Sequence, residues 1–316
     1  MKYLVTGGAG FIGSHLCERL LKEGNEVCVI DNFNNYYNPD IKRNNIKGFE
    51  DKVEIVEGDI RNKEDLEKIF SKDIDTVIHL AAMAGVRPSI ENEALYWDVN
   101  INGTRNLLEK CKEYGIKKFV FASSSSVYGN NPNVPFKVID RVDNPISPYA
   151  ATKKAGELMC YTYHHLYNIN IACLRFFTVF GPRQRPDLAI NKFTRMILNA
   201  ETIPVYGDGS TSRDYTFIED IVDGIVSSIE YVSENENVYE IFNLGGDSPV
   251  TLSKMIKVIE EKTGKKAKIE RLPMQAGDVE RTYADIELST EKLGYKPKTS
   301  FEDGIEKFVE WYRSNI

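Results

Sequence analysis

The sequence is poor in the residues that build metal sites and disulfide frameworks. It has five cysteines and four histidines in 316 residues. The cysteines are scattered and odd in number, and none forms a Cys-x-x-Cys pair, which fits a reducing compartment better than a disulfide framework. No histidine has metal-ligand spacing with a cysteine, so we expect no structural metal.

Long apolar runs and excess positive charge are also missing. No run approaches the roughly 18 apolar residues of a membrane-spanning helix. In the opening MKYLVTGGAG, the apolar run before the glycines is too short for a secretory signal. Lys and Arg number 40 against 47 Asp and Glu, a net charge of −7, which argues against non-specific nucleic-acid binding. We therefore expect a cytoplasmic protein that binds neither nucleic acid nor membrane.

Short apolar segments alternate with helix-like segments through the first half of the chain. Such short runs, flanked by turn signals, are typical of buried strands. They are KYLVTG, EVCVID, VEIVEGD, DTVIHLAA, KKFVFASSS and IACLRFF. Helical patterns occupy residues 11–23, 62–70, 100–114 and 148–167. This alternation predicts an α/β fold with a doubly wound parallel sheet of Rossmann type, covered by helices on both faces.

The alternation of apolar strand-like segments with helix-like segments ends after residue 175. Segments such as FGPRQRPDLA and VYGDGSTSRDYTF are rich in glycine, proline and charge, and IFNLGG reads as one more strand. The tail returns to helix periodicity. We predict a nucleotide-binding domain over residues 1–175, to which 214–248 returns, and a smaller, irregular domain made mainly of 176–213 and 249–316.

A glycine frame follows the first strand and opens the first helix. In VTGGAGFIG, Gly7, Gly10 and Gly13 permit a tight turn and close approach of the backbone to a pyrophosphate. The helix N-terminus adds free N–H groups and the positive end of its dipole. Asp31, at the end of the second strand, can accept hydrogen bonds from adenosine ribose hydroxyls and would repel a 2′-phosphate. The sequence thus favours NAD over NADP.

A tyrosine and a lysine stand four residues apart in SPYAATKKAG. Pro148 is a plausible first helical residue with Ser147 as its cap, so Tyr149 and Lys153 should share one helix face. A free tyrosine has a pKa of about 10, too high for a good base at neutral pH, and a neighbouring ammonium favours the phenolate. Either the pair only packs and solvates the helix, or the lysine makes the phenol a usable base.

The order of these elements identifies a family. The glycine frame, HLAA at 79–82, ASSSSVYG at 122–129 and the Tyr149–Lys153 pair together resemble the extended short-chain dehydrogenase/reductases over essentially the whole chain. The resemblance implies that Tyr149 is the base and that Lys153 also holds the nicotinamide ribose. Ser124 matches the family's catalytic serine, and Ser126 matches the serine or threonine that often accompanies it.

The same resemblance implies further contacts to a tightly bound NAD that is regenerated in each turnover. Asp59 and Ile60 match residues beside the adenine, and Asn100 matches a structural asparagine near the site. The remaining cofactor positions are Phe11, Ile12, Asn32, Leu80, Ala81 and Ala82.

The residues directly after Ser124 narrow the reaction. Family dehydratases place Asp-Glu there and decarboxylases typically carry a glutamate, whereas this chain has Ser125, Ser126 and Val127. RFFTVFGPRQRPDLA and AAMAGVRPSI resemble UDP-glucuronate 4-epimerases. The resemblance implies 4-epimerisation of UDP-glucuronate to UDP-galacturonate through a 4-keto sugar. An epimerase of UDP-glucose or UDP-N-acetylhexosamine, a UDP-glucuronate decarboxylase, and a non-catalytic NAD-sensing protein stay open as alternatives.

The second half then becomes the UDP-sugar-binding part. We expect Thr178 and Arg185, with Ser126, to hold the sugar carboxylate by charge-assisted hydrogen bonds, although Arg185 could instead contact phosphate or solvent. The other expected substrate contacts are Arg87 beside the sugar, Arg213 and Arg281 on the diphosphate, Asp278 on the uridine ribose, and Tyr206, a core residue or a stacking partner of uracil.

Two of the predicted helices, 100–114 and 148–167, match those that form a four-helix dimer interface in relatives. Tyr161, Leu166 and Tyr167 would supply its apolar area. The resemblance therefore implies a homodimer.

Overall fold

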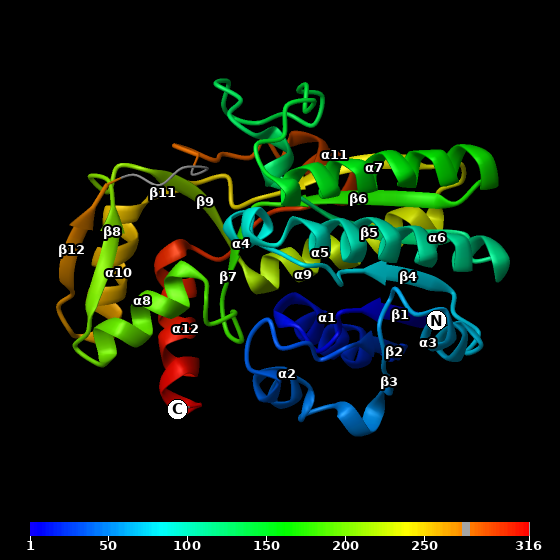
Figure 1. Ribbon diagram of the computed structural model, residues 1–316, viewed down its shortest axis with the longest axis horizontal. Coiled ribbons are helices and arrows are strands. Elements are labelled where there is room, and N and C mark those ends of the chain that lie inside the picture. The colour runs from blue at the N-terminus through cyan, green and yellow to red at the C-terminus, as the bar shows by residue number, and fades with distance from the viewer. Residues whose placement is uncertain (274–278, 316) are drawn as a thin grey trace.

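A seven-stranded parallel sheet lies at the centre of the structure, a computed structural model that describes residues 1–273 and 279–315 (Figure 1). Its strand order is β10-β6-β5-β4-β1-β2-β3. The strands are β1 Lys2–Thr6, β2 Glu26–Asp31, β3 Glu54–Glu57, β4 Thr76–His79, β5 Lys118–Ser124, β6 Asn170–Phe176 and β10 Tyr239–Leu244. The chain leaves β3 at one edge and re-enters at β4 beside β1, so the carboxyl ends of β1 and β4 flank the switch point where such folds bind ligands.

Helices cover both faces of this sheet, as the sequence predicts. Helices α1 and α9 pack on each other over one face, and α3, α6 and α7 cover the other. Their bounds are α1 Phe11–Lys22, α3 Lys63–Phe70, α6 Thr104–Glu113, α7 Pro148–Tyr167 and α9 Ile218–Glu234. Successive strand residues enter opposite cores: Leu4 belongs to the α3/α6/α7 side and Val5 to the α1/α9 side. Both are fully buried, which explains the near-continuous apolar strands.

The sequence patterns miss several short helices around the switch point. These are α2 Pro39–Ile46, α4 Val86–Glu91 and α5 Glu93–Trp97, together with the 3-10 turns Glu50–Lys52 and Ser125–Tyr128. The helix predicted from residue 100 is preceded by a π-helical segment, Asp98–Gly103, and continues as α6. Segments this short show too few turns for a 3.6-residue period to stand out.

The second half of the chain builds a smaller region beside the large sheet, at the left of Figure 1. It holds a three-stranded sheet, β11-β9-β7, and a two-stranded sheet, β12-β8. The strands are β7 Thr178–Phe180, β8 Thr202–Tyr206, β9 Ser212–Phe217, β11 Pro249–Thr251 and β12 Lys268–Leu272. The helices of this region are α8 Ala189–Leu198, α10 Leu252–Thr263 and α12 Phe301–Ser314, whereas α11 Glu287–Leu293 packs against α9 and β10 of the large sheet. Strand β10 and helix α9 pack with the large sheet; the division into domains stays a prediction.

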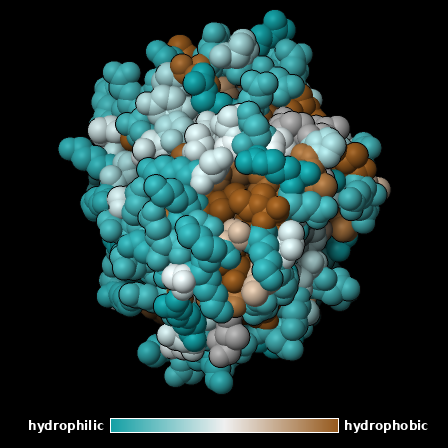
Figure 2. Space-filling view, turned by 90° about the vertical axis from the view of Figure 1, so that its left-hand side faces the viewer, coloured by the Kyte–Doolittle hydropathy of each residue, from teal (hydrophilic) through white to brown (hydrophobic). Residues whose placement is uncertain are grey.

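The face seen from this end is mainly hydrophilic, with a hydrophobic cluster in a hollow near its centre (Figure 2). Among residues 1–273 and 279–315, the structure contains no helix whose length and apolar character would let it cross a membrane.

Candidate active site

The glycine frame forms a backbone cradle at the carboxyl end of β1. Gly7 has φ of +71°, and a Cβ there would lie 2.9 Å from the backbone nitrogen of Ala81. A Cβ on Gly13 would lie 2.2 Å from the carbonyl oxygen of Gly7, so neither position accepts a side chain. Helix α1 begins directly after Gly10, whose lack of a side chain leaves the helix N-terminus open. This cradle fits the pyrophosphate of a dinucleotide.

A cavity of about 620 Å³ extends from this cradle across the ends of the strands. Most of the predicted site residues line it, from both halves of the chain. They are Gly7, Gly10, Phe11, Ile12, Gly13, Asp31, Asn32, Asp59, Ile60, Leu80, Ala81, Ala82, Ser124, Tyr149, Lys153, Thr178 and Arg185.

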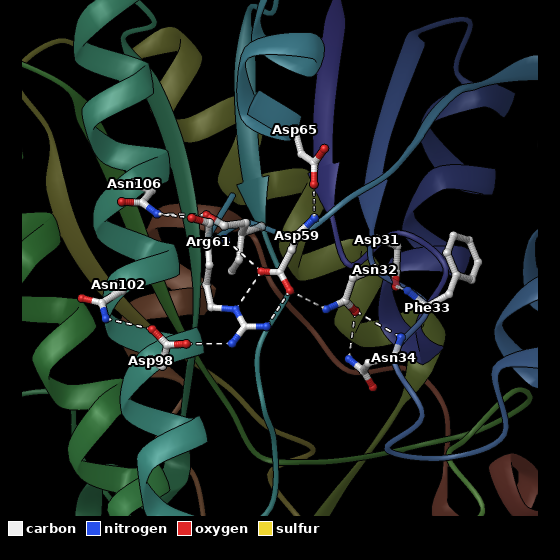
Figure 3. Close-up of polar contacts among 11 residues, drawn as sticks. Asp31, Asn32, Phe33, Asn34, Asp59, Arg61, Asp65, Asp98, Asn102 and Asn106 are labelled. Atoms are coloured by element: carbon white, nitrogen blue, oxygen red, sulfur yellow. Dashed lines mark hydrogen bonds and ion pairs between the residues drawn. The ribbon is translucent and has the colours of Figure 1, made fainter. Parts of the chain in front are cut away.

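Asp31 is fixed at the cradle by backbone donors. Its carboxylate accepts from the N–H of Ala9 at 3.2 Å. It also accepts from the N–H of Phe33 at 2.9 Å (Figure 3). Burial raises the pKa of Asp31, while the charge of Lys42 and the two backbone hydrogen bonds oppose the shift. The carboxylate is therefore in place for the predicted ribose contact.

Asp59, which the resemblance places beside the adenine, sits within a network of polar side chains (Figure 3). Arg61 donates two hydrogen bonds to its carboxylate, from Nε to Oδ1 at 2.9 Å and from Nη2 to Oδ2 at 2.8 Å. Asn32 donates to Oδ2 at 2.9 Å, and Nη1 of Arg61 reaches Asp98 at 2.7 Å. Hydrogen bonding from Arg61 lowers the pKa of Asp59 to about 2. The sequence prediction missed Arg61, although a cation two residues after Asp59 was a usable signal.

Helix α7 presents the tyrosine and lysine as predicted. Ser147 caps the helix by accepting from the N–H of Ala150 at 3.1 Å, and Pro148 is its first residue. The Lys153 ammonium lies 5.9 Å from the centre of the Tyr149 ring. Its Nζ donates to the carbonyl of Ala122 on β5 at 2.7 Å. Burial lowers the pKa of Lys153 to about 8.

The protonation of Tyr149 differs from the expectation based on Lys153 alone. Burial raises the pKa of the phenol, and the two opposing influences are a hydrogen bond with Ser124 and the positive charge of Arg185. Burial dominates, and the expected contribution of Lys153 does not appear among these influences.

The serines stand at the end of β5 beside Tyr149. Ser124 is buried and donates from Oγ to Oγ of Ser126 at 3.2 Å, and the N–H of Ser126 donates back to Oγ of Ser124 at 3.2 Å. Ser124 lines the cavity, whereas Ser126 lies outside the lining. Ser124 is thus the hydroxyl placed to meet a ligand, with Ser126 as its neighbour.

Asn100 does not line the cavity; it forms hydrogen bonds with two segments that border the site. Its amide accepts from the N–H of Met83 at 2.8 Å and donates to the carbonyl of the same residue at 3.0 Å. It also donates to Oγ1 of Thr152 on α7 at 3.0 Å. These bonds tie the loop after β4 to the helix that carries Tyr149, which fits the structural role implied for Asn100 rather than a cofactor contact.

Thr178 and Arg185 form the wall of the cavity that belongs to the second half of the chain. Thr178 is the first residue of β7 and Arg185 lies just before α8. The Arg185 guanidinium forms a bidentate ion pair with Asp187, Nε to Oδ1 at 3.0 Å and Nη2 to Oδ2 at 2.6 Å. Its side chain is only 17% exposed. Both predicted residues line the cavity, and the sequence prediction misses Tyr36, whose ring centre lies 5.0 Å from the guanidinium carbon.

Four further predicted substrate residues, Arg87, Tyr206, Arg213 and Arg281, lie outside the cavity lining. Arg87 on α4 and Tyr206 at the end of β8 are in contact, with the guanidinium carbon 5.4 Å from the ring centre. Arg213 donates to the carbonyl of Ser212 at 2.9 Å, and Ser212 forms an isolated β-bridge with Arg281. Arg213 and Arg281 thus lie on adjacent segments. Asp278 falls outside the described residues.

Comparison with known proteins agrees with this geometry. The family model GDP-mannose 4,6 dehydratase matches residues 4–308. A UDP-glucuronate 4-epimerase of Thermodesulfobacterium geofontis is 46% identical, covering 99% of this chain and 97% of the relative.

Two solved structures cover the fold from end to end. The UDP-glucuronic acid 4-epimerase of Bacillus cereus, in complex with UDP-glucuronic acid and NAD, has a TM-score of 0.94 and 38% identity over 100% of both chains. The UDP-glucose 4-epimerase of Thermus thermophilus, in complex with NAD, has a TM-score of 0.90 and 33% identity over 100% of both chains. Sequence match, sheet topology and the Tyr149–Lys153 helix lead to one conclusion: the chain belongs to the extended short-chain dehydrogenase/reductase family that acts on sugar nucleotides.

Proposed function

We propose that this protein is an NAD-dependent UDP-glucuronate 4-epimerase that forms UDP-galacturonate through a transient 4-keto sugar. The observation that carries the proposal is the cavity, which joins the glycine cradle to Tyr149 and Ser124 and ends at Thr178 and Arg185. The proposed dinucleotide site, the proposed base and a cation that can bind a carboxylate therefore share one cavity. The whole-length likeness to the Bacillus cereus enzyme supports the same assignment.

Side chains of the protein remove the proton from the sugar's 4-hydroxyl group and later return it. Tyr149 takes this proton as its phenolate, and Ser124 donates a hydrogen bond to the same oxygen. Positive charge from Arg185 opposes the effect of burial on the pKa of Tyr149. NAD⁺, when bound, supplies a reversible hydride acceptor and a further positive charge beside the phenol, so C4 can be oxidised and then reduced on its other face. Lys153, whose ammonium donates to the carbonyl of Ala122, would hold the nicotinamide ribose.

The carboxylate decides between epimerisation and decarboxylation. A 4-keto-glucuronate carries its carboxylate β to the ketone and can lose carbon dioxide. Thr178 and Arg185 hold that carboxylate in an orientation that disfavours C–C cleavage, by charge-assisted hydrogen bonds. The positions after Ser124 carry no acid for dehydration.

Neutral UDP-hexoses are the second candidate substrates, favoured by the likeness to the Thermus thermophilus UDP-glucose 4-epimerase. The charged side chain of Arg185 on the cavity wall favours the uronate instead, because the donors beyond the two that bind Asp187 can form charge-assisted hydrogen bonds with a sugar carboxylate, which a neutral sugar lacks. Proton NMR of UDP-glucuronate incubated with the protein and NAD⁺ distinguishes these candidate activities. A galacturonate anomeric signal supports the proposal, a UDP-pentose signal identifies a decarboxylase, and an unchanged spectrum directs the assay to UDP-glucose.

We also propose that the protein is a homodimer through α6 and α7, in the reducing environment of the cytoplasm. Leu158, Tyr161 and Leu166 expose 57%, 52% and 59% of their surface along α7. Tyr167, also expected there, is partly buried and packs under Lys112, so its contribution is smaller than predicted. Light scattering after size exclusion tests this: Leu166→Arg should convert a dimer to a monomer, whereas a monomeric wild type would refute it.

A further inference from the structure

We infer that Tyr36 is a positioning residue for Arg185, holding its guanidinium in the orientation that selects a carboxylate-bearing sugar. This inference rests on the proposed function. It assigns a role in sugar selection to the loop between β2 and α2, which lies in the nucleotide-binding part of the chain.

The guanidinium of Arg185 is constrained along one edge by Asp187. Two N–H donors, on Nε and Nη2, go to the two oxygens of that carboxylate. A bidentate pair of this kind fixes the plane of the guanidinium as well as its position. The guanidinium also interacts with the Tyr36 side chain, and the donors that remain are left for a ligand in the cavity that Arg185 lines.

Tyr36 constrains the same group from its face. The guanidinium carbon lies 5.0 Å from the ring centre, within the range of a cation–π contact. Tyr36 lines the cavity on the cofactor-binding side of the molecule, while Arg185 and Asp187 belong to the segment before α8. The contact therefore joins the two halves of the protein at the sugar end of the cavity.

Tyr36 is itself fixed by the walls of the site. A Cβ on Gly85 would lie 3.3 Å from its hydroxyl oxygen, so the loop after β4 passes close by at this point. Its hydroxyl also interacts with the hydroxyl of Tyr96. Tyr96 in turn packs edge-on against the Tyr149 ring, at 6.3 Å and 85°, and donates to the carbonyl of Ala84 at 3.0 Å. A line of aromatic rings thus connects the guanidinium to the proposed base.

This arrangement matters because the orientation of the carboxylate governs its loss. A guanidinium fixed along one edge and one face offers a carboxylate one direction of approach. If the face is released, Arg185 gains freedom to follow a rotating carboxylate, and both binding selectivity and the ratio of epimer to pentose should fall. A purely structural role of Tyr36 would affect charged and neutral sugars alike.

The test compares two ligands on the NAD-loaded protein by calorimetry. For Tyr36→Leu, the dissociation constant for UDP-glucuronate should rise by about tenfold while that for UDP-glucose changes by less than about twofold. The UDP-pentose fraction during turnover should increase. Tyr36→Phe keeps the ring and should retain most of the selectivity. Tyr36→Met replaces the leucine variant if that protein does not retain NAD.

A double-mutant cycle with Arg185→Lys shows whether Tyr36 acts through the guanidinium. Lysine keeps the charge without the planar group, so Tyr36→Leu should then change UDP-glucuronate affinity by less than about threefold. Equal losses for both sugars, or an undiminished effect in the Arg185→Lys background, would overturn the inference. A wild type that epimerises only neutral sugars would instead refute the proposed function, so the two failures are distinguishable.

Discussion

The Lys153 ammonium lies 5.9 Å from the centre of the Tyr149 ring, and its Nζ donates to the carbonyl of Ala122 rather than to the phenol. Burial moves the two groups in opposite directions: the pKa of Tyr149 rises and that of Lys153 falls to about 8. Burial thereby favours the neutral form of each group, and positive charge that enters the cavity would favour the phenolate of Tyr149. The proposed base becomes effective when a cationic nicotinamide ring lies beside it.

Replacement of the phenol tests the assignment of the base. Tyr149→Phe should reduce turnover of UDP-glucuronate by about three orders of magnitude, because the ring still packs but no group takes the proton. Tyr163→Phe, on the same helix but outside the cavity lining, is the matched control and should stay within about twofold of wild type. Initial rates by NMR provide the measurement, and comparable rates for the two variants would contradict the mechanism.

The desolvation of Lys153 predicts a pH-dependent stability. Its pKa falls from 10.5 to about 8 on folding, so the unfolded chain binds more protons between these values and stability rises with pH across this window. Relative to Lys153→Met, the wild type should gain about 1 kcal/mol per pH unit in the middle of the window.

Urea unfolding without added NAD, at several pH values from about 7.5 to about 10, measures that difference. The control is Lys266→Met, at a side chain that is 86% exposed, for which the difference from wild type should not depend on pH. A flat difference for Lys153→Met as well would show that the ammonium is hydrated in the folded protein.

Arg61 should contribute to cofactor affinity through Asp59. Its guanidinium is the largest influence that lowers the pKa of Asp59, and it also ties that carboxylate to Asp98. Arg61→Gln should free the Asp59 side chain and weaken NAD binding by about tenfold. Arg105→Gln, at an exposed position on α6, is the control. Calorimetric titration with NAD⁺ measures the affinity. An unchanged affinity in Arg61→Gln would show that this network does not contribute to cofactor binding.

The cation on the sugar side of the cavity gives a separate prediction. Arg185→His should lower kcat/KM for UDP-glucuronate by about 10- to 100-fold and allow some UDP-pentose to form, since the bidentate donor for the carboxylate is lost. Arg195→His, at an arginine on α8 that pairs with Glu201 at the surface, should leave both quantities near wild type. If Arg185→His behaves the same way, Arg185 does not contact the substrate.

The sequence predicts the elements whose information is local. Apolar runs reveal the buried strands, the glycine frame reveals the cradle, and the spacing of Tyr149 and Lys153 reveals their shared helix face. Contacts that depend on loop paths are a different matter. Tyr36 meets Arg185 only because the loop after β2 and the segment before α8 converge, and neither segment has a period that predicts where it goes.

The same limit explains the misjudged details. The Tyr–Lys spacing gives proximity but not desolvation, so the pKa of Tyr149 is shifted in the opposite direction from the expected one. Asn100 could be placed near the site, but only the three-dimensional structure shows that Met83 and Thr152 occupy its amide.

The most direct test of the central claim is the product formed from UDP-glucuronate carrying deuterium at C4. Oxidation and reduction of the same carbon within one closed site should give UDP-galacturonate that retains the label at C4, with no net NADH and no UDP-pentose. Proton NMR reads the label and the product together. Loss of the deuterium to solvent, or a UDP-pentose as the main product, would contradict the account.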